Sequence, residues 1–229
     1  MSTQPAPAAR PSSDRRTSTL QKRTSTALPK PSSIVLDPSV LIAQHAQLTG
    51  THPITIGPGA VLHPHSKISS VLAPVVLGEG VVIYERARIG VGVGDAKAGD
   101  ANRRTSVLPD RGSGGSLARG EGTVLGRNVV VETNCVVEAS EIGEGSVVEA
   151  ACTLGRGCVI GRYCIISAAS VIPANTRLDD FTVVYSGNEK RINQTMKDRK
   201  EVRQSYKTKH AKQLDMFRKL IPNQLAKWA

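Results

Sequence analysis

An aliphatic residue returns every sixth position through most of the segment between Leu36 and Val184, and this spacing constrains the fold more than any other feature. A helix repeats every 3.6 residues and a strand every two, so neither element produces a period of six. Repeats this short are typical of hexapeptide β-helices, in which each unit forms one flat face and neighbouring coils bury one another's aliphatic residues. The strictest run is uninterrupted and comprises Ile142, Val148, Leu154, Ile160, Ile166, Ile172, Leu178 and Val184.

A second, small position lies four residues after each aliphatic one in this run. Serine, threonine or cysteine occupies it, and each is small enough to pack inside a tight turn. All four cysteines of the chain fall on this position, and none has the CxxC spacing of a zinc or redox site. We therefore predict that they are buried packing residues, with Cys135 directly beneath Cys152 in the neighbouring coil. The four are Cys135, Cys152, Cys158 and Cys164.

The period divides the chain into three regions. Residues 1–33 are rich in Pro, Ser, Thr and Arg, with almost no large apolar residue, and we predict a disordered basic arm. Residues 34–186 form the predicted hexapeptide-repeat β-helix, an all-β solenoid. Its period slips near residues 53–55 and 69–76, which indicates small bulges, and is lost over 91–123, which predicts a flexible loop. Residues 187–229 form a predicted C-terminal amphipathic helix and tail.

The net charge of +11 lies in the two flanks rather than in the repeats. Residues 1–33 hold six basic residues and one acidic residue, and residues 187–229 hold twelve basic and four acidic residues. The repeats hold twelve basic and fourteen acidic residues. With 3% aromatic residues and no reading motif, we expect no nucleic-acid binding. No apolar run is long enough for stable membrane insertion, and we expect no secretory signal.

The predicted helix carries one apolar stripe on an otherwise cationic surface. Its residues recur at intervals of four or three, with His210 between them, and Pro222 should end the helix. Three roles stay open for this candidate docking helix: it could bind a partner, pack on its own solenoid or lie on a membrane surface. The stripe comprises Val202, Tyr206, Leu214, Phe217 and Ile221.

Two classes of enzyme share the predicted architecture. Its acyltransferases use a histidine general base beside a cleft between three subunits, and γ-class carbonic anhydrases bind a metal through three histidines of adjacent subunits. The repeats contain His45, His52, His63 and His65, all in the first half, and the predicted loop contains no histidine.

Of these histidines, His63 and His65 are two residues apart, which predicts that they share one face of a strand. Two ligands nevertheless make a weak metal site. We therefore expect no catalytic residue, no metal site and no cofactor. A γ-carbonic-anhydrase-like or acyltransferase-like enzyme is the alternative.

Several segments together resemble the dynactin subunit 6 family. They are residues 56–64 (IGPGAVLHP), the Gly78-Glu79-Gly80 turn before Ile83, the mid-solenoid loop, and the helical sequences at residues 214–217 and 220–223. The similarity runs from about residue 34 to residue 225. It implies a left-handed coil, against the usual right-handed crossover rule.

The same resemblance implies a non-catalytic structural subunit of dynactin in the cytoplasm and cytoskeleton. Such a subunit would pair with dynactin subunit 5 at the pointed end of the actin-related filament. It would lie beside the pointed-end actin-related protein and dynactin subunit 4. Through dynein and cargo adaptors, it would support cargo transport on microtubules.

The chain departs from that family in its long basic arm and in the composition of the 91–123 loop. In both segments two basic residues precede a Thr-Ser pair, a pattern that basophilic kinases select. A phosphate there would reverse the local charge. We predict phosphorylation at Ser18, Ser25 and Ser106.

Overall fold

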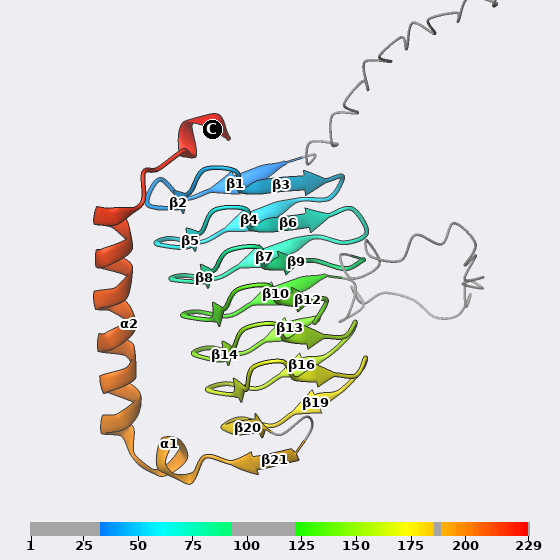
Figure 1. Cartoon of the computed structure of the whole chain (residues 1–229), viewed down its shortest axis with the longest axis vertical. Coiled ribbons are helices and arrows are strands. Elements are labelled where there is room, and N and C mark those ends of the chain that lie inside the picture. The colour runs from blue at the N-terminus through cyan, green and yellow to red at the C-terminus, as the bar shows by residue number, and fades with distance from the viewer. Residues whose placement is uncertain (1–32, 93–121, 186–188, 229) are drawn as a thin grey trace, which may run out of the picture.

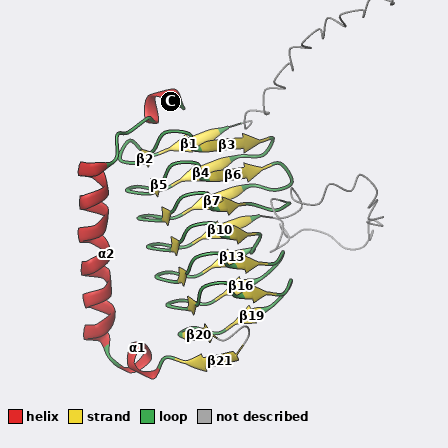
Figure 2. Ribbon diagram, in the orientation of Figure 1, coloured by secondary structure: helices red, strands yellow, loops and turns green. Residues whose placement is uncertain are grey.

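The computed structural model describes residues 33–92, 122–185 and 189–228 of the 229-residue chain. In these ranges the backbone winds into a stack of coils whose short strands line up in three sheets, parallel except for the last strand of the second (Figure 1). A long helix runs along one side of the stack (Figure 2). The predicted parallel β-helix with a C-terminal helix is therefore confirmed.

Within the described residues, each coil contributes strands to the sheets in turn. The first sheet contains β1 (Ile34–Leu36), β4 (Ile54–Ile56), β7 (Val75–Leu77), β10 (Thr123–Leu125), β13 (Glu141–Ile142), β16 (Val159–Ile160) and β19 (Arg177–Leu178). The second contains β2 (Leu41–Ile42), β5 (Val61–Leu62), β8 (Val82–Ile83), β11 (Val130–Val131), β14 (Val147–Val148), β17 (Ile165–Ile166), β20 (Thr182–Tyr185) and β21 (Glu189–Ile192). The third contains β3 (Gln47–Gly50), β6 (Lys67–Ser70), β9 (Arg88–Ile89), β12 (Val136–Val137), β15 (Thr153–Leu154) and β18 (Val171–Ile172).

The aliphatic positions form continuous columns inside the stack. Ile142 is in register with Leu125 on one side and with Ile160 on the other, and all three are buried. The four cysteines are buried and free, as predicted. The amide of Val136 donates to the carbonyl of Cys152, which places Cys135 and Cys152 in neighbouring coils at the same position. The six-residue period therefore identified the core correctly.

Residues other than glycine adopt the left-handed conformation at the corner between the second and third sheets. Side chains rarely accept a positive φ, so a corner that repeats it in successive coils is fixed by the stack around it. In each of these coils, the residue at the same position of the turn has a positive φ. The residues concerned are His45, His65, Arg86, Asn134, Ala151 and Ala169.

The C-terminal segment closes both ends of the second sheet. At one end, β21 pairs antiparallel with β20, and the short helix α1 (Gln194–Asp198) follows. The helix α2 (Lys200–Leu220) then runs back along the second sheet and ends before Pro222, as predicted. At the other end, Asn223 accepts a hydrogen bond from the amide of Ile42 (3.0 Å) and donates one to the carbonyl of Val40 (3.0 Å).

A final 3-10 turn, Leu225–Lys227, follows, and Leu225 and Trp228 pack against the core. None of the helices in the described ranges is long and apolar enough to cross a membrane.

Candidate functional site

The apolar stripe of α2 packs on the chain's own solenoid. Leu214, Phe217 and Ile221 form a cluster with outward-facing residues of the second sheet, namely Leu41, Val61 and Val82. Val202 and Tyr206 are half-buried along the same helix. Three roles were open for the candidate docking helix: binding a partner, packing on its own solenoid or lying on a membrane surface. The structure shows packing on the solenoid. Leu214 is buried in this contact, and the other residues of the stripe are partly buried.

His63 lies under this helix. Its ring stacks on Tyr84 (4.5 Å between centroids) and meets the edge of Phe217 (4.7 Å). The residue is 8% exposed, and its Nε2 has no hydrogen-bond partner among the described residues. Burial lowers the pKa of His63, since a charged imidazole would lose its hydration there, and nearby Glu85 opposes that shift. His63 is therefore a neutral packing residue.

The prediction that His63 and His65 share one face of a strand is wrong. Both residues lie in the turn after β5 rather than in a strand, so the alternation of strand side chains does not apply to them. His63 is directed at α2, whereas His65 is exposed and stacks on His45 with ring centroids 5.0 Å apart. Within the described ranges, no three His, Cys, Asp or Glu residues come together as a metal site would require.

His210 is held by the backbone. It lies on α2 and is buried, and its Nε2 donates to the carbonyl oxygen of Gly80 (2.7 Å). This bond ties the helix to a corner of the solenoid, and burial keeps the ring of His210 away from the surface where a substrate could reach it.

His52 differs from His210 in that it is only half-buried, so the surface can reach its ring; one ring nitrogen is fixed and the other is free of hydrogen bonds within the described residues. It lies at the corner between β3 and β4, and it is half-buried. Its Nδ1 is 2.9 Å from the carbonyl oxygen of Ser70, so Nδ1 carries the proton and donates it. In the neutral imidazole, this bond leaves the lone pair on Nε2, as a general base requires.

The corner around His52 is tightly bonded. The hydroxyl of Ser70 donates to the carbonyl of His52 (2.7 Å), and the amide of His52 donates back to the carbonyl of Ser70 (3.0 Å). The hydroxyl of Thr51 donates to the carbonyl of Val71 (3.2 Å). Both the backbone and the ring of His52 are thus fixed from the neighbouring coil.

Apolar residues lie exposed at the same corner, where the period slips. Val71 and Leu72 follow Ser70 directly, and they are 45% and 56% exposed. In the next coil, Gly92 lies against Leu72: a Cβ there would be 2.9 Å from Leu72 Cδ1, and its φ is +81°. The predicted bulges and the start of the predicted loop therefore fall at this one corner. Between residues 93 and 121, the loop lies outside the described residues, as do Ser18, Ser25 and Ser106.

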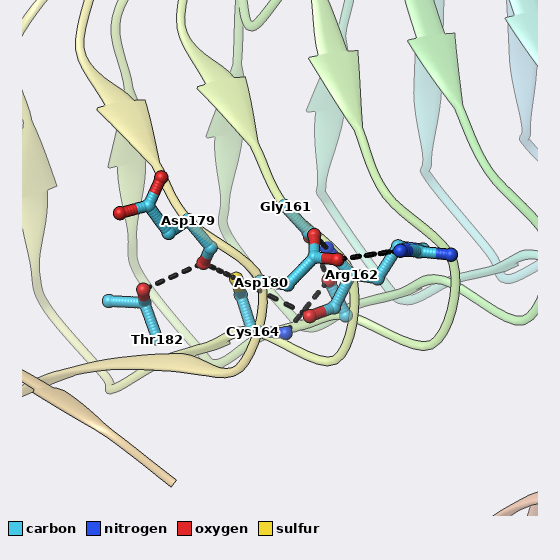
Figure 3. A network of polar contacts seen from close by, with 7 residues as sticks. Gly161, Arg162, Cys164, Asp179, Asp180 and Thr182 are labelled. Carbon is cyan, nitrogen blue, oxygen red and sulfur yellow. Dashed lines mark hydrogen bonds and ion pairs between the residues drawn. The ribbon is translucent and has the colours of Figure 1, made fainter. Parts of the chain in front are cut away.

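A polar network at the opposite end of the stack closes turns rather than forming a site (Figure 3). Asp180 accepts hydrogen bonds from the backbone amide (2.7 Å) and from Nε (3.0 Å) of Arg162. Thr182 donates to the carbonyl of Asp179 (2.7 Å), and the Cys164 thiol lies 3.1 Å from the same oxygen. Burial raises the pKa of Cys164 to about 11, so this thiol is not a nucleophile at neutral pH.

Comparisons with known proteins identify the fold. No family model matches the chain, and no curated protein matches it. A crystal structure of a hexapeptide transferase family protein from Anaplasma phagocytophilum matches with 11% identity and a TM-score of 0.53, over 83% of this chain and 96% of that one. A putative acetyltransferase from Bacillus cereus matches with 15% identity and a TM-score of 0.39, over 80% and 92% of the two chains. The fold is therefore a left-handed parallel β-helix of hexapeptide repeats.

The match with the TM-score of 0.53 corrects the predicted function. The matched structure that shares the fold is described as a transferase family protein and not as a dynactin subunit. The expectations of a non-catalytic dynactin subunit, and of a chain that is not an enzyme, are therefore corrected. At 11% identity the likeness shows the fold alone. His52 was missed because a lone histidine carries no motif, although the slip of the period beside it marked the corner.

Proposed function

We propose that this chain is an acyl-transfer enzyme of the hexapeptide-repeat type, with His52 as its general base. The observation that carries the proposal is the hydrogen bond from Nδ1 of His52 to the carbonyl of Ser70, which leaves the lone pair on Nε2. A base that a third group orients in this way is the arrangement expected of proton-transfer catalysis. The fold shared with a hexapeptide transferase family protein supports the same class.

The proposed reaction transfers an acyl group from a thioester to an acceptor hydroxyl or amine. Nε2 of His52 takes the proton of the acceptor while the acceptor oxygen or nitrogen attacks the thioester carbonyl. The carbon–sulfur bond then breaks, and the leaving thiolate takes the proton from the imidazolium. The carbonyl of Ser70 keeps the Nδ1 hydrogen bond throughout, which holds the tautomer and stabilises the transient positive charge.

The exposed residues beside His52 suit the acyl group. Val71 and Leu72 project apolar surface at the same corner, and an acyl chain laid on them would remove that surface from water. Such burial contributes about 25 cal/mol per Å² of apolar area. Longer acyl chains should therefore bind more tightly than acetyl groups.

The experiment measures thiol release from acetyl- and octanoyl-coenzyme A with a panel of hydroxyl and amine acceptors. We expect acceptor-dependent release, faster with the octanoyl donor at low concentration, and a loss of about a hundredfold or more in His52→Gln. His45→Gln is the matched control, because His45 is exposed at another corner, and it should keep the wild-type rate. Full activity in His52→Gln, or no acceptor-dependent release by the folded wild type, would overturn the proposal.

A further inference from the structure

The helix α2 has a second face, opposite to the apolar stripe that packs on the solenoid. Residues three or four apart lie on the same side of a helix, and six exposed residues follow this spacing. The helix lies along the outside of the stack, so these residues point away from the coils (Figure 2). We call them the outer face of α2, which comprises Ser205, Lys209, Lys212, Met216, Lys219 and Leu220.

Contacts on the inner side of α2 keep the outer face directed outward. Lys207 forms an ion pair with Glu144 (2.8 Å), and Gln213 donates a hydrogen bond to the hydroxyl of Tyr84. The bond from His210 to the backbone of the solenoid holds the same side of the helix. The rotation of α2 about its own axis is therefore fixed from one end of the outer face to the other.

The outer face carries positive charge that no acidic residue balances. Within the described residues, none of its three lysines takes part in an ion pair. Asp215 lies at its margin and pairs with Arg218 (3.4 Å). Glu201 lies one turn before the face, where a carboxylate favours the helix N-terminus. Three ammonium groups are thus spread over about 15 Å of helix.

Two large apolar side chains lie among these lysines. Met216 and Leu220 are one helical turn apart and are 55% and 70% exposed. Leu220 also borders an open hollow of about 620 Å³ whose lining includes Leu41, Ile221 and Pro222. The inner stripe already anchors the helix, so packing of the solenoid does not require Met216 or Leu220 to be apolar. The C-terminal half of the outer face therefore combines exposed apolar surface with cations.

This composition suits an anionic lipid surface better than a protein or a small ligand. Protein interfaces are enriched in aromatic residues and Arg and depleted in Lys, whereas the outer face has Lys and neither of the others. A lysine ammonium is a point charge on a long flexible stem and does not bind phosphate in the bidentate manner of Arg. The outside of a helix is convex and cannot enclose a small molecule. Lysines flanking exposed apolar residues are typical of helices that lie at a membrane interface.

We infer that the outer face of α2 binds a membrane surface that contains anionic lipids. The helix lies along the surface, with its lysines at the lipid headgroups and with Met216 and Leu220 at the boundary between headgroups and acyl chains. The inference goes beyond the proposed acyl transfer and does not depend on it. His52 lies at the corner between the third and first sheets, whereas α2 packs on the second.

The test is co-sedimentation of the full chain with vesicles of phosphatidylcholine, alone or with about 30% phosphatidylserine, at about 0.15 M salt. We expect binding to the anionic vesicles only. A lysine near such a surface changes the partition coefficient roughly fivefold, so Lys209→Gln/Lys212→Gln/Lys219→Gln should lower it at least about tenfold. Failure of the folded wild type to bind the anionic vesicles would overturn the inference.

The matched charge control is Lys67→Gln/Arg86→Gln/Arg177→Gln. It removes three positive charges from exposed positions on other faces of the solenoid and should change the partition coefficient less than about threefold. An equal loss in the two triple variants would mean that net charge alone attracts the vesicles. Wild-type binding by the outer-face variant would mean that another segment binds them, since residues 1–33 are present in every variant. The inference fails in both cases.

Met216→Ser/Leu220→Ser tests the apolar contact. We expect a partition coefficient at least about threefold lower with the same salt dependence, because the substitutions change no charge. The control Val35→Ser removes a side chain that is 59% exposed on the first sheet, and it should bind as the wild type does. Undiminished binding by Met216→Ser/Leu220→Ser, with displacement of the vesicles by polyglutamate, would identify a site for acidic polymers and sink the inference. Thermal melts check the fold of each variant.

Discussion

At the scale of the residue, the solenoid depends on inward side chains that meet the same position of the coils above and below. Ile160 is almost fully buried and is in register with Ile142 and Leu178. Val159, its neighbour in β16, points outward and is only partly buried. Adjacent residues of one short strand therefore experience opposite environments.

This contrast gives a direct test of the core. We expect Ile160→Asp to abolish cooperative folding, because an unpaired buried carboxylate costs several kcal/mol against a total stability of about 5–15 kcal/mol. Val159→Asp should stay folded, since its carboxylate faces water. Circular dichroism during urea unfolding measures both. A folded Ile160→Asp variant with a wild-type midpoint would contradict the assignment of the core.

The sequence could predict the core and not the candidate base for a physical reason. Burial of apolar surface acts on every coil, so it leaves a period that is visible at Ile142 or Ile160 without any structure. The role of His52 depends on a single hydrogen bond to a backbone carbonyl of the next coil. Every residue has such a carbonyl, so the sequence does not indicate which of them accepts the bond. The same limit explains the error at His63 and His65, whose turn geometry overrides the spacing of two.

At the scale of the element, α2 and the second sheet share one apolar contact with a titratable group inside it. His63 contacts both Tyr84 and Phe217, and its Nε2 has no hydrogen-bond partner in the part of the chain that the structure describes. Sequence periodicity located α2 and its end, because the stripe repeats and Pro222 cannot continue a helix. It missed β21, whose four residues are all exposed and carry no alternating pattern.

The burial of His63 makes the free energy of unfolding decrease as the pH falls. Burial holds the pKa of folded His63 below 6.5, so below that pH the unfolded chain binds more protons than the folded one. The contribution of neutral His63 to the free energy of unfolding is complete above pH 6.5, and it decreases as the pH falls toward the pKa of His63 in the folded state. We expect the free energy of unfolding to fall between pH 7.5 and 5.5, by at most about 1.4 kcal/mol per pH unit from this group.

The measurement compares variants at the two pH values by urea unfolding. His63→Gln should reduce the difference between pH 7.5 and pH 5.5, whatever its effect on stability at either pH. His45→Gln, at an exposed corner, should leave that difference as it is in the wild type. An unchanged difference in His63→Gln would show that other groups cause the pH dependence.

At the scale of the whole molecule, the C-terminal segment covers the edges of the second sheet at both ends of the stack. Unpaired edge strands invite association with other chains, so covering them protects the solenoid. β21 covers one edge through backbone pairing, and Asn223 covers the other through its side-chain amide. Loss of either cover should open the adjoining coil first.

Asn223→Ala tests the cover at the first coil. The substitution removes the two hydrogen bonds to the first coil and a third from the amide of Leu225 to Oδ1 (3.0 Å), each with a net contribution of about 0.5–1.5 kcal/mol. We expect faster hydrogen exchange at the amides of Leu41 and Ile42, without a change at β16. Gln224→Ala is the control, because the hydrogen bond of Gln224 to Ile42 comes from its backbone amide. Equal exchange in the two variants would contradict a role for the Asn223 side chain.

The length of α2 limits how the solenoid can evolve. Its 21 residues extend about 31 Å, close to the roughly 29 Å between the first and last strands of the seven-stranded first sheet. A duplication that added one coil would therefore need about three more helical residues. Three residues turn a helix through about 300°, which would swing Leu214 and Phe217 away from their partners. Adding or removing one coil would therefore require a compensating change in the length and the apolar stripe of α2.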